Sequence, residues 1–262
     1  MTAAPIGLIA GSGRLPVLFA QAAERAGRSV VAVAHEGETD PALAAAAWIK
    51  VGQLGRIVEV MRNAGVTEAV LCGGIKKPKL LDLRPDWLGL KVLARLRDAG
   101  DDLALRAIAD ALEEEGVRIV SPLPLVPELL VPHGPMGKRR LTNEQRADAV
   151  IGLSAARTLG QADIGQTVVV KRGVVLAAEA VEGTDACIAR GGAFAPGAVV
   201  VKSRKPQQDD RFDVPTVGPA TIDACAAARC AGLAVEAGTT LVLDRSDLVA
   251  RADRAGIAVE GI

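Results

Sequence analysis

Aromatic and imidazole side chains are scarce in this sequence. Of its 262 residues none is Tyr, three are Phe, two are Trp and two are His, although 50% are hydrophobic. The core must therefore be built from Ala, Val, Leu and Ile, and Tyr is excluded from every catalytic role. Metal centres that need several imidazole ligands, such as those of dinuclear metallophosphoesterases, are excluded as well.

Cysteine is equally sparse, and two familiar motifs of phosphate chemistry are missing. The chain has neither the Nudix pyrophosphatase signature nor the P-loop G-x-x-x-x-G-K-[ST]. Because no C-x-x-C spacing occurs, we expect free buried thiols rather than a structural zinc site. The soft metal ligands that the chain offers are Cys72, Cys187, Cys225, Cys230, His35 and His133.

Neither sign of charge is in excess, since Lys plus Arg and Asp plus Glu both number 31. A chain without a basic excess has no general attraction for phosphate backbones, so we expect no nucleic acid partner. No basic leader precedes the first expected strand at Ile6, and no apolar run is long enough to cross a membrane. We therefore expect a soluble, cytoplasmic protein.

Strand-like and helix-like patterns alternate over residues 6–120, which predicts an α/β fold with parallel strands joined by helical crossovers. We expect residues 1–125 to form a doubly wound, Rossmann-like parallel-sheet domain. The expected strands are 6–10, 30–34, 48–51, 69–72 and 117–120, and the expected helices are 15–26, 41–47, 55–64, 87–99 and 102–115.

Five prolines between residues 121 and 137 disfavour a helix or a central strand, and we assign residues 126–141 as a Pro-rich linker. The second domain, 142–262, opens with the capping-box pattern Thr142-Asn-Glu-Gln145, which predicts a helix to Leu159. Two strands joined in a hairpin at Arg172-Gly173 follow. Beyond them we expect an α/β domain of mixed topology, with helices 184–190, 219–230 and 246–255 and strands 198–201, 241–243 and 257–260.

Two glycine turns follow expected strands, at Gly11-Ser12-Gly13 and in CGGIKKP, residues 72–78. Both should lie at the carboxyl edge of the parallel sheet, where α/β proteins bind ligands. Pro16 replaces the third glycine of a dinucleotide-binding G-x-G-x-x-G, so this alternative, with Glu36 on a ribose, has weak support. A tight turn that needs only small residues explains the first motif about equally well.

The stretch KSRKPQQDDRFDVPTVG, residues 202–218, gathers cations, acids and amides just after an expected buried strand. Lys202 and Lys205 suit phosphate oxygens, while Asp209 and Asp213 suit a hard divalent cation. A solvated loop would explain the charges, but it would not need the Pro-Thr-Val-Gly turn before the next helix. The pattern predicts a site for a magnesium-bound phosphate ester.

Three carboxylates fall within seven residues, at Glu179, Glu182 and Asp185. Asp185 lies in the first turn of an expected helix, where the helix dipole favours an acid without any functional role. Its clustering with the other two leaves a metal-binding role open.

Several motifs, taken in this order, resemble the LpxI family of UDP-2,3-diacylglucosamine pyrophosphatases: GLIAGSGRLP, GRIVEVMRNAGV, CGGIKKP, GDDLALR, DIGQTVVV, EAVEGTDACI and KSRKPQQDDRFDVPTVG. The resemblance implies an enzyme of lipid A biosynthesis in Gram-negative bacteria, which hydrolyses UDP-2,3-diacylglucosamine to UMP and 2,3-diacylglucosamine 1-phosphate (lipid X). It also implies Mg²⁺ or Mn²⁺, two domains with the lipid between them, a homodimer, and a peripheral contact with inner-membrane lipid.

The resemblance also assigns roles to residues. The essential Asp of the family's R-x-D-x-P-T-x-G motif falls on Asp213, and the relatives' Gly-Gly-Gly is Gly-Ser-Gly here. We expect catalytic roles for Asp213, Lys205 and Lys202, and metal ligation by Asp213, Asp185 and Glu182. The expected substrate-binding residues are Gly11, Ser12, Gly13, Gly74, Lys76, Thr184, Gln208 and Thr216.

Two other functions stay open on the residues alone. One is a nucleotide-cofactor (NAD-type) oxidoreductase that uses Gly11–Gly13 and Glu36. The other is a non-catalytic lipid or nucleotide binding module, whose charged loop binds without turnover. Added NAD(H) would reveal the oxidoreductase by an absorbance or fluorescence change, and incubation with UDP-2,3-diacylglucosamine separates the binding module from a hydrolase, because only a hydrolase releases UMP.

Overall fold

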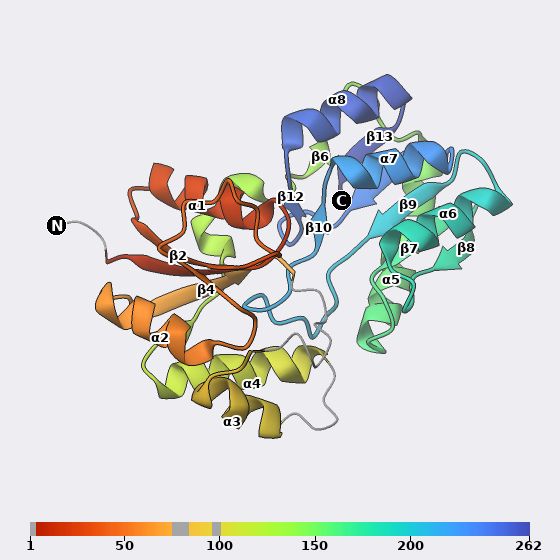
Figure 1. Cartoon of the computed structure of the whole chain (residues 1–262). Helices are drawn as coiled ribbons and strands as arrows, with labels where there is room; N and C mark the ends of the chain where they lie inside the picture. The colour runs from red at the N-terminus through yellow and green to blue at the C-terminus, as the bar shows by residue number, and fades with distance from the viewer. Residues whose placement is uncertain (1–3, 75–83, 96–100) are drawn as a thin grey trace. The chain divides into compact units, whose positions relative to one another are not determined.

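The structure is a computed structural model that describes residues 4–74, 84–95 and 101–262 (Figure 1). It consists of two compact units. The N-terminal unit comprises residues 1–127 together with 210–212, and the C-terminal unit comprises 128–209 and 213–262. Each unit has its own sheet and its own hydrophobic core.

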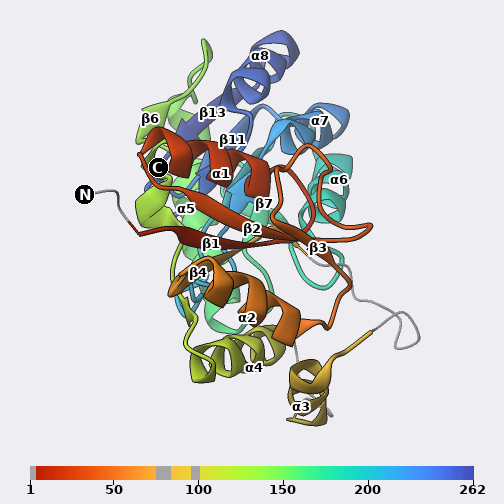
Figure 2. The same ribbon diagram turned by 60° about the vertical axis from the view of Figure 1, so that its left-hand side comes forward.

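The described part of the N-terminal unit forms a five-stranded parallel sheet with the order β3-β2-β1-β4-β5. Helix α1 covers one face, and α2 and α4 lie on the other (Figure 2). This doubly wound arrangement confirms the predicted fold class. The elements are β1 (Ile6–Ala10), α1 (Leu15–Arg25), β2 (Val30–His35), β3 (Ala47–Ile49), α2 (Leu54–Asn63), β4 (Glu68–Cys72), α3 (Trp87–Arg95), α4 (Asp101–Glu114) and β5 (Arg118–Ile119).

The helix expected over residues 41–47 is wrong. Asp40 Oδ1 accepts a hydrogen bond from the backbone N–H of Ala42 at 2.9 Å, and Asp40 O accepts one from Leu43 N at 3.0 Å. An Asp side chain that bonds its own backbone two residues on favours a turn over a helix. The chain turns here and enters β3 at Ala47.

The C-terminal unit has a six-stranded mixed sheet with the order β6-β13-β11-β9-β7-β8. Strands β9, β11 and β13 are parallel, while β6, β7 and β8 join them in antiparallel pairs, so the predicted mixed topology is confirmed. The strands are β6 (Gly134–Pro135), β7 (Thr167–Lys171), β8 (Val174–Ala178), β9 (Val199–Lys202), β11 (Gly232–Val235) and β13 (Ala258–Gly261), with β10 (Thr216–Val217) and β12 (Leu241–Val242) forming a second, two-stranded sheet.

Alternate residues of this sheet enter two cores, as the period of two along a strand requires. Val168, Val170, Val199 and Val201 form one cluster with residues of α5 (Asn143–Gln161). The opposite face packs against α6 (Thr184–Phe194), α7 (Pro219–Ala227) and α8 (Arg245–Ala255). The capping box predicted for α5 is confirmed, because Thr142 Oγ1 accepts from Gln145 N and Gln145 Oε1 accepts from Thr142 N.

Strand β11 was absent from the sequence-based assignment, although it lies between β9 and β13. Its four residues, Gly-Leu-Ala-Val, are too few and too small to give a clear strand pattern. The glycine has a packing reason, since a Cβ at Gly232 would lie 2.4 Å from Leu141 Cδ2.

Residues 128–141 belong to the C-terminal unit. Val131 N donates to Thr240 O at 2.9 Å, and Met136 N donates to Val259 O at 2.9 Å. Short 3-10 turns at Leu123–Leu125 and Pro127–Leu129 precede these contacts. No helix among the described residues combines the length and apolar character needed to cross a membrane.

Candidate functional site

The two glycine turns of the N-terminal unit lie together at the carboxyl ends of β1 and β4, as expected. Strand β1 has β2 on one side and β4 on the other, so this is the switch point where doubly wound sheets bind ligands. Gly11 N donates to Cys72 O at 2.8 Å, and Ser12 donates to Gly74 O through its backbone N–H at 2.6 Å and its hydroxyl at 2.8 Å. Of the predicted residues, Lys76 lies outside the described part of the chain.

The glycines of these turns have a structural explanation. A Cβ at Gly11 would lie 2.3 Å from Gly74 O, and one at Gly73 would lie 2.4 Å from Ser12 O. Gly13 and Gly73 both have a positive φ, of +88° and +86°, which favours glycine, but nothing lies within 4 Å of a Cβ at Gly13. Close packing of the two turns therefore accounts for Gly11 and Gly73, and Gly13 is the position that faces open space.

The buried His35 contacts the backbone just before the first glycine turn. Ala10 O accepts hydrogen bonds from His35 Nδ1 at 2.9 Å and from Thr39 Oγ1 at 2.7 Å, and His35 N donates to Thr39 Oγ1 at 2.9 Å. Burial lowers the pKa of His35, so the imidazole is held neutral with its Nδ1 proton on Ala10 O. Glu36, proposed for a ribose in the NAD alternative, is exposed beside it.

The C-terminal unit brings together three of the predicted residues around one ammonium group. Lys202 is the last residue of β9, and its Nζ donates to Thr184 Oγ1 at 3.3 Å and to Thr216 O at 3.1 Å. Thr184 begins α6, after Gly183 at φ +82°. A helix N-terminus beside a lysine is a favourable place for an anion.

Burial and neighbouring acids act on Lys202 in opposite directions. Its residue is only 8% exposed, and this desolvation lowers the pKa of the ammonium. The carboxylates of Glu179, Asp213 and Asp185 raise it, in that order of strength. Asp213 and Asp185, both predicted from sequence, therefore lie within electrostatic reach of Lys202.

Gln208 connects Lys205 to Asp213. Its side chain is buried, accepts from Lys205 N at 3.2 Å through Oε1, and donates to Asp213 Oδ2 through Nε2. Asp213 N also donates to Asp209 O at 3.2 Å, so the charged stretch folds back on itself. The Lys205 ammonium, in contrast, pairs with the Asp163 carboxylate at 2.8 Å.

The three carboxylates expected to hold a metal ion are not gathered as a ligand set. Glu182 pairs with Arg190 and accepts from Ala180 N at 3.1 Å, and a backbone hydrogen bond together with Arg190 lowers the pKa of Glu182. Within the described ranges, no three His, Cys, Asp or Glu side chains are placed to hold an ion. Asp213 and Asp185, which both act electrostatically on Lys202, could supply oxygen ligands to a divalent cation.

Sequence analysis missed Thr167 and assigned no separate role to Glu179. Thr167 begins β7 directly opposite Lys202, and its hydroxyl lies 3.4 Å from Thr184 Oγ1. Glu179 follows β8 and accepts the Thr184 hydroxyl proton at 3.0 Å. The sequence signal that could have identified Thr167 is its place directly before three valines, because a buried polar side chain at the end of a strand needs a hydrogen-bond partner.

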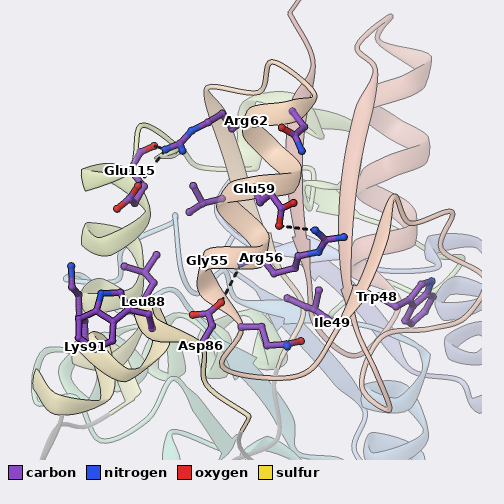
Figure 3. A pocket seen from close by; sticks show the side chains of 14 residues that line it. Trp48, Ile49, Gly55, Arg56, Glu59, Arg62, Asp86, Leu88, Lys91 and Glu115 are labelled. Carbon is purple, nitrogen blue, oxygen red and sulfur yellow. Dashed lines mark hydrogen bonds and ion pairs between the residues drawn. The ribbon is translucent and has the colours of Figure 1, made fainter.

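A separate groove of about 700 Å³ lies in the N-terminal unit, beside β3, α2 and α3 (Figure 3). Four of its charged groups form two ion pairs, Arg56 with Glu59 at 2.6 Å and Arg62 with Glu115 at 3.3 Å. Asp86 accepts from the backbone N–H of Arg56 at 3.2 Å. None of the predicted substrate-binding residues that the structure describes lines this groove, and we assign it no catalytic role.

Comparison with known proteins gives matches along nearly the whole chain. The sequence profile of the LpxI N-terminal domain matches residues 5–129, and that of the LpxI C-terminal domain matches residues 132–260. The chain is also 40% identical, over 271 aligned positions, to a protein of Caulobacter vibrioides named UDP-2,3-diacylglucosamine pyrophosphatase LpxI. That alignment covers 98% of this chain and 97% of the relative.

Proposed function

This chain belongs to the LpxI family, and from that premise we propose that it hydrolyses the diphosphate of UDP-2,3-diacylglucosamine to UMP and 2,3-diacylglucosamine 1-phosphate, in lipid A biosynthesis. The observation that carries the proposal is the 40% identity to the Caulobacter vibrioides protein over 98% of the chain. The buried Lys202, whose ammonium contacts Thr184 at the start of α6, supports it, because a fixed cation beside a helix N-terminus suits a diphosphate.

The residues around Lys202 take the following roles. Lys202 neutralises charge on the diphosphate, and Thr184, Thr216 and Gln208 contact the substrate or hold the groups that do. Asp213 orients the attacking water, with its carboxylate fixed by Gln208. Lys205 reaches the substrate by exchanging its Asp163 partner for a phosphate oxygen.

The N-terminal turns supply backbone contacts in this proposal. Gly11, Ser12, Gly13 and Gly74 present a turn at the switch point of the parallel sheet, which suits a nucleotide or sugar phosphate. The backbone and hydroxyl protons of Ser12 are both engaged with Gly74 O, so Ser12 would contact the substrate as a hydrogen-bond acceptor. Lys76, two residues after Gly74 in the sequence, is proposed as a further cation for the substrate.

A requirement for Mg²⁺ or Mn²⁺ is part of the proposal. Asp213 and Asp185 would hold the ion, and Glu182 would join them only by leaving Arg190. When bound, such an ion neutralises charge that develops on the diphosphate. EDTA should abolish UMP release and Mg²⁺ or Mn²⁺ should restore it; full activity in metal-free buffer would contradict the requirement.

We also propose that the protein is a cytoplasmic homodimer, as its resemblance to the family implies. A peripheral contact with the inner membrane is proposed because the substrate carries two acyl chains. Sedimentation of the purified protein tests the dimer, and co-sedimentation with phospholipid vesicles tests the membrane contact. A monomer that ignores vesicles at all protein concentrations would contradict both.

The decisive experiment is incubation of the purified protein with UDP-2,3-diacylglucosamine, followed by quantification of UMP and the lipid phosphate. Equal amounts of the two products support hydrolysis. Tight substrate binding without UMP would point to a binding module, and a fluorescence change with NADH would point to the oxidoreductase alternative.

A further inference from the structure

Glu179 is a buried carboxylate to which neither the motif nor the family comparison gives a role. Its residue is 8% exposed. Its Oε1 accepts a hydrogen bond from Thr184 Oγ1 at 3.0 Å, and its Oε2 accepts one from the backbone N–H of Gln166 at 3.3 Å. Both carboxylate oxygens are therefore directed by the protein, unlike those of an acid that faces solvent.

The backbone at Glu179 is fixed as well. Glu179 N donates to Thr167 O at 2.9 Å, which ties the end of β8 to the start of β7. A Cβ at Gly165 would lie 2.2 Å from Glu179 O, so only glycine permits this close approach. The carboxylate thus extends from a fixed point toward the first residue of α6.

Thr184 links this carboxylate to Lys202. A hydroxyl has one proton and two lone pairs, and the Thr184 proton is used on Glu179. Its lone pairs are then available to Lys202 Nζ, which donates to Thr184 Oγ1 at 3.3 Å and to Thr216 O at 3.1 Å. The third N–H of the ammonium has no acceptor in the part of the chain that the structure describes, and a ligand oxygen can take it.

We propose that Glu179 is a positioning residue that acts through Thr184: it fixes the Thr184 hydroxyl, which in turn aims the Lys202 ammonium at an anionic oxygen of the substrate. The identification of that anion as a diphosphate rests on the proposed function. A misplacement of about 1 Å of a charge that stabilises the transition state is enough to cost on the order of a hundredfold in rate. The negative charge of Glu179 also helps to keep Lys202 protonated in its buried site.

The test is a double-mutant cycle on kcat/KM for UMP release with Glu179→Ala, Thr184→Val and both together. Glu179→Ala should lower kcat/KM by about a hundredfold, and Glu179→Gln by about tenfold, because the amide oxygen still accepts the Thr184 proton. In the Thr184→Val background, Glu179→Ala should add less than about threefold. Fully additive losses would overturn the proposal.

The matched control is Glu260→Ala, which removes another buried carboxylate of the same unit. Glu260 is 1% exposed, accepts from Leu141 N at 2.8 Å and pairs with Arg146 at 3.0 Å. Its loss should lower the melting temperature and leave kcat/KM within about twofold. If the loss of activity in Glu179→Ala and Glu179→Gln simply follows their melting temperatures, as stability alone would dictate, the positioning role is wrong.

A crystal structure of the Glu179→Ala protein gives a readout that does not depend on activity. The Lys202 Nζ to Thr184 Oγ1 contact should lengthen beyond hydrogen-bond distance; an unchanged contact would overturn the proposal. This structure separates the positioning role of Glu179 from the proposed hydrolase function. If the wild-type protein releases no UMP, the proposed function fails, while the geometry of the variant still decides the role of Glu179.

Discussion

The two units both present polar groups at the carboxyl ends of parallel strands, but they build these edges from different groups. The N-terminal edge consists of backbone amides and carbonyls of two packed glycine turns. The C-terminal edge adds charged and polar side chains, with the Lys202 ammonium at its centre. Among the described residues, the buried polar ones of the N-terminal unit are His35 and Thr39, and those of the C-terminal unit are Asp148, Thr167, Glu179, Lys202, Ser203, Gln208, Thr240 and Glu260.

This difference suggests that the N-terminal edge binds a ligand, whereas the C-terminal edge stabilises charge during a reaction. Buried charge is costly unless it is paired, so a cluster such as Lys202 with Glu179 is retained where charge must be stabilised. Backbone turns can hold a ligand but cannot titrate or change their charge. We therefore expect variants of the polar cluster around Lys202 to act on turnover and variants of the N-terminal turns to act on stability.

The largest expected effect is on Asp213→Ala. If Asp213 orients the attacking water, its loss acts on the transition state more than on the ground state. Turnover should fall by about a thousandfold, or about 4 kcal/mol of barrier, with substrate affinity and melting temperature nearly unchanged. Steady-state kinetics with a binding assay measure this, and Asp223→Ala, an exposed ion-paired acid on α7, is the control. Near-normal turnover in a folded Asp213→Ala protein would remove the residue from the mechanism.

The sequence indicates which residues lie at the carboxyl edge of the C-terminal sheet better than it indicates which side chains pair with one another. The location of Lys202, Thr184 and Thr216 near one another could be expected, because each follows or begins an element at the same end of the sheet. Pairs that join distant segments, such as Lys205 with Asp163, could not, since they depend on how α5 ends relative to the charged stretch.

The errors in the fold have similar causes. Residues 41–47 have the composition of a helix, yet the Asp40 side chain bonds the following backbone and makes a turn. Strand β11 is short and contains Gly and Ala, so its central position depends on the strands beside it and on Leu141. Strong local patterns, such as the capping box at Thr142, were predicted correctly because they need no distant partner.

The second prediction concerns the N-terminal turns and uses the variant Gly11→Ala. Its Cβ would lie 2.3 Å from a carbonyl oxygen of the second turn, so the two turns must separate. The free energy of unfolding should fall by roughly 3 kcal/mol. Gly13→Ala, where the Cβ meets open space, should lose only about 1 kcal/mol from its positive φ. Chemical denaturation measures both; equal losses would mean that packing of the turns is not what requires glycine.

The third prediction concerns Lys205, a cation of the C-terminal unit that already has a partner. Lys205→Ala should lower kcat/KM by about tenfold and raise KM, because a cation on the ground-state diphosphate contributes to affinity and rate. Asp163→Asn frees the same ammonium, so it should leave kcat/KM unchanged or raise it. If both variants lose activity equally, the ion pair itself is what matters and Lys205 has no substrate role.

The smallest effect is the pH dependence that His35 gives to the N-terminal turn. Burial lowers the pKa of His35 in the folded state below its ordinary value of 6.5. As the pH falls below this value, His35 is therefore protonated more readily in the unfolded chain than in the folded protein. The stability from this residue is complete above about pH 6.5 and declines as the pH falls, by at most about 1.4 kcal/mol per pH unit. Denaturation between about pH 7.5 and pH 5.5 should show this slope in the wild type and a shallower slope in His35→Gln. An identical slope in the two proteins would mean that the neutral imidazole on Ala10 O does not hold the turn, and that the backbone contacts of the glycines do so alone.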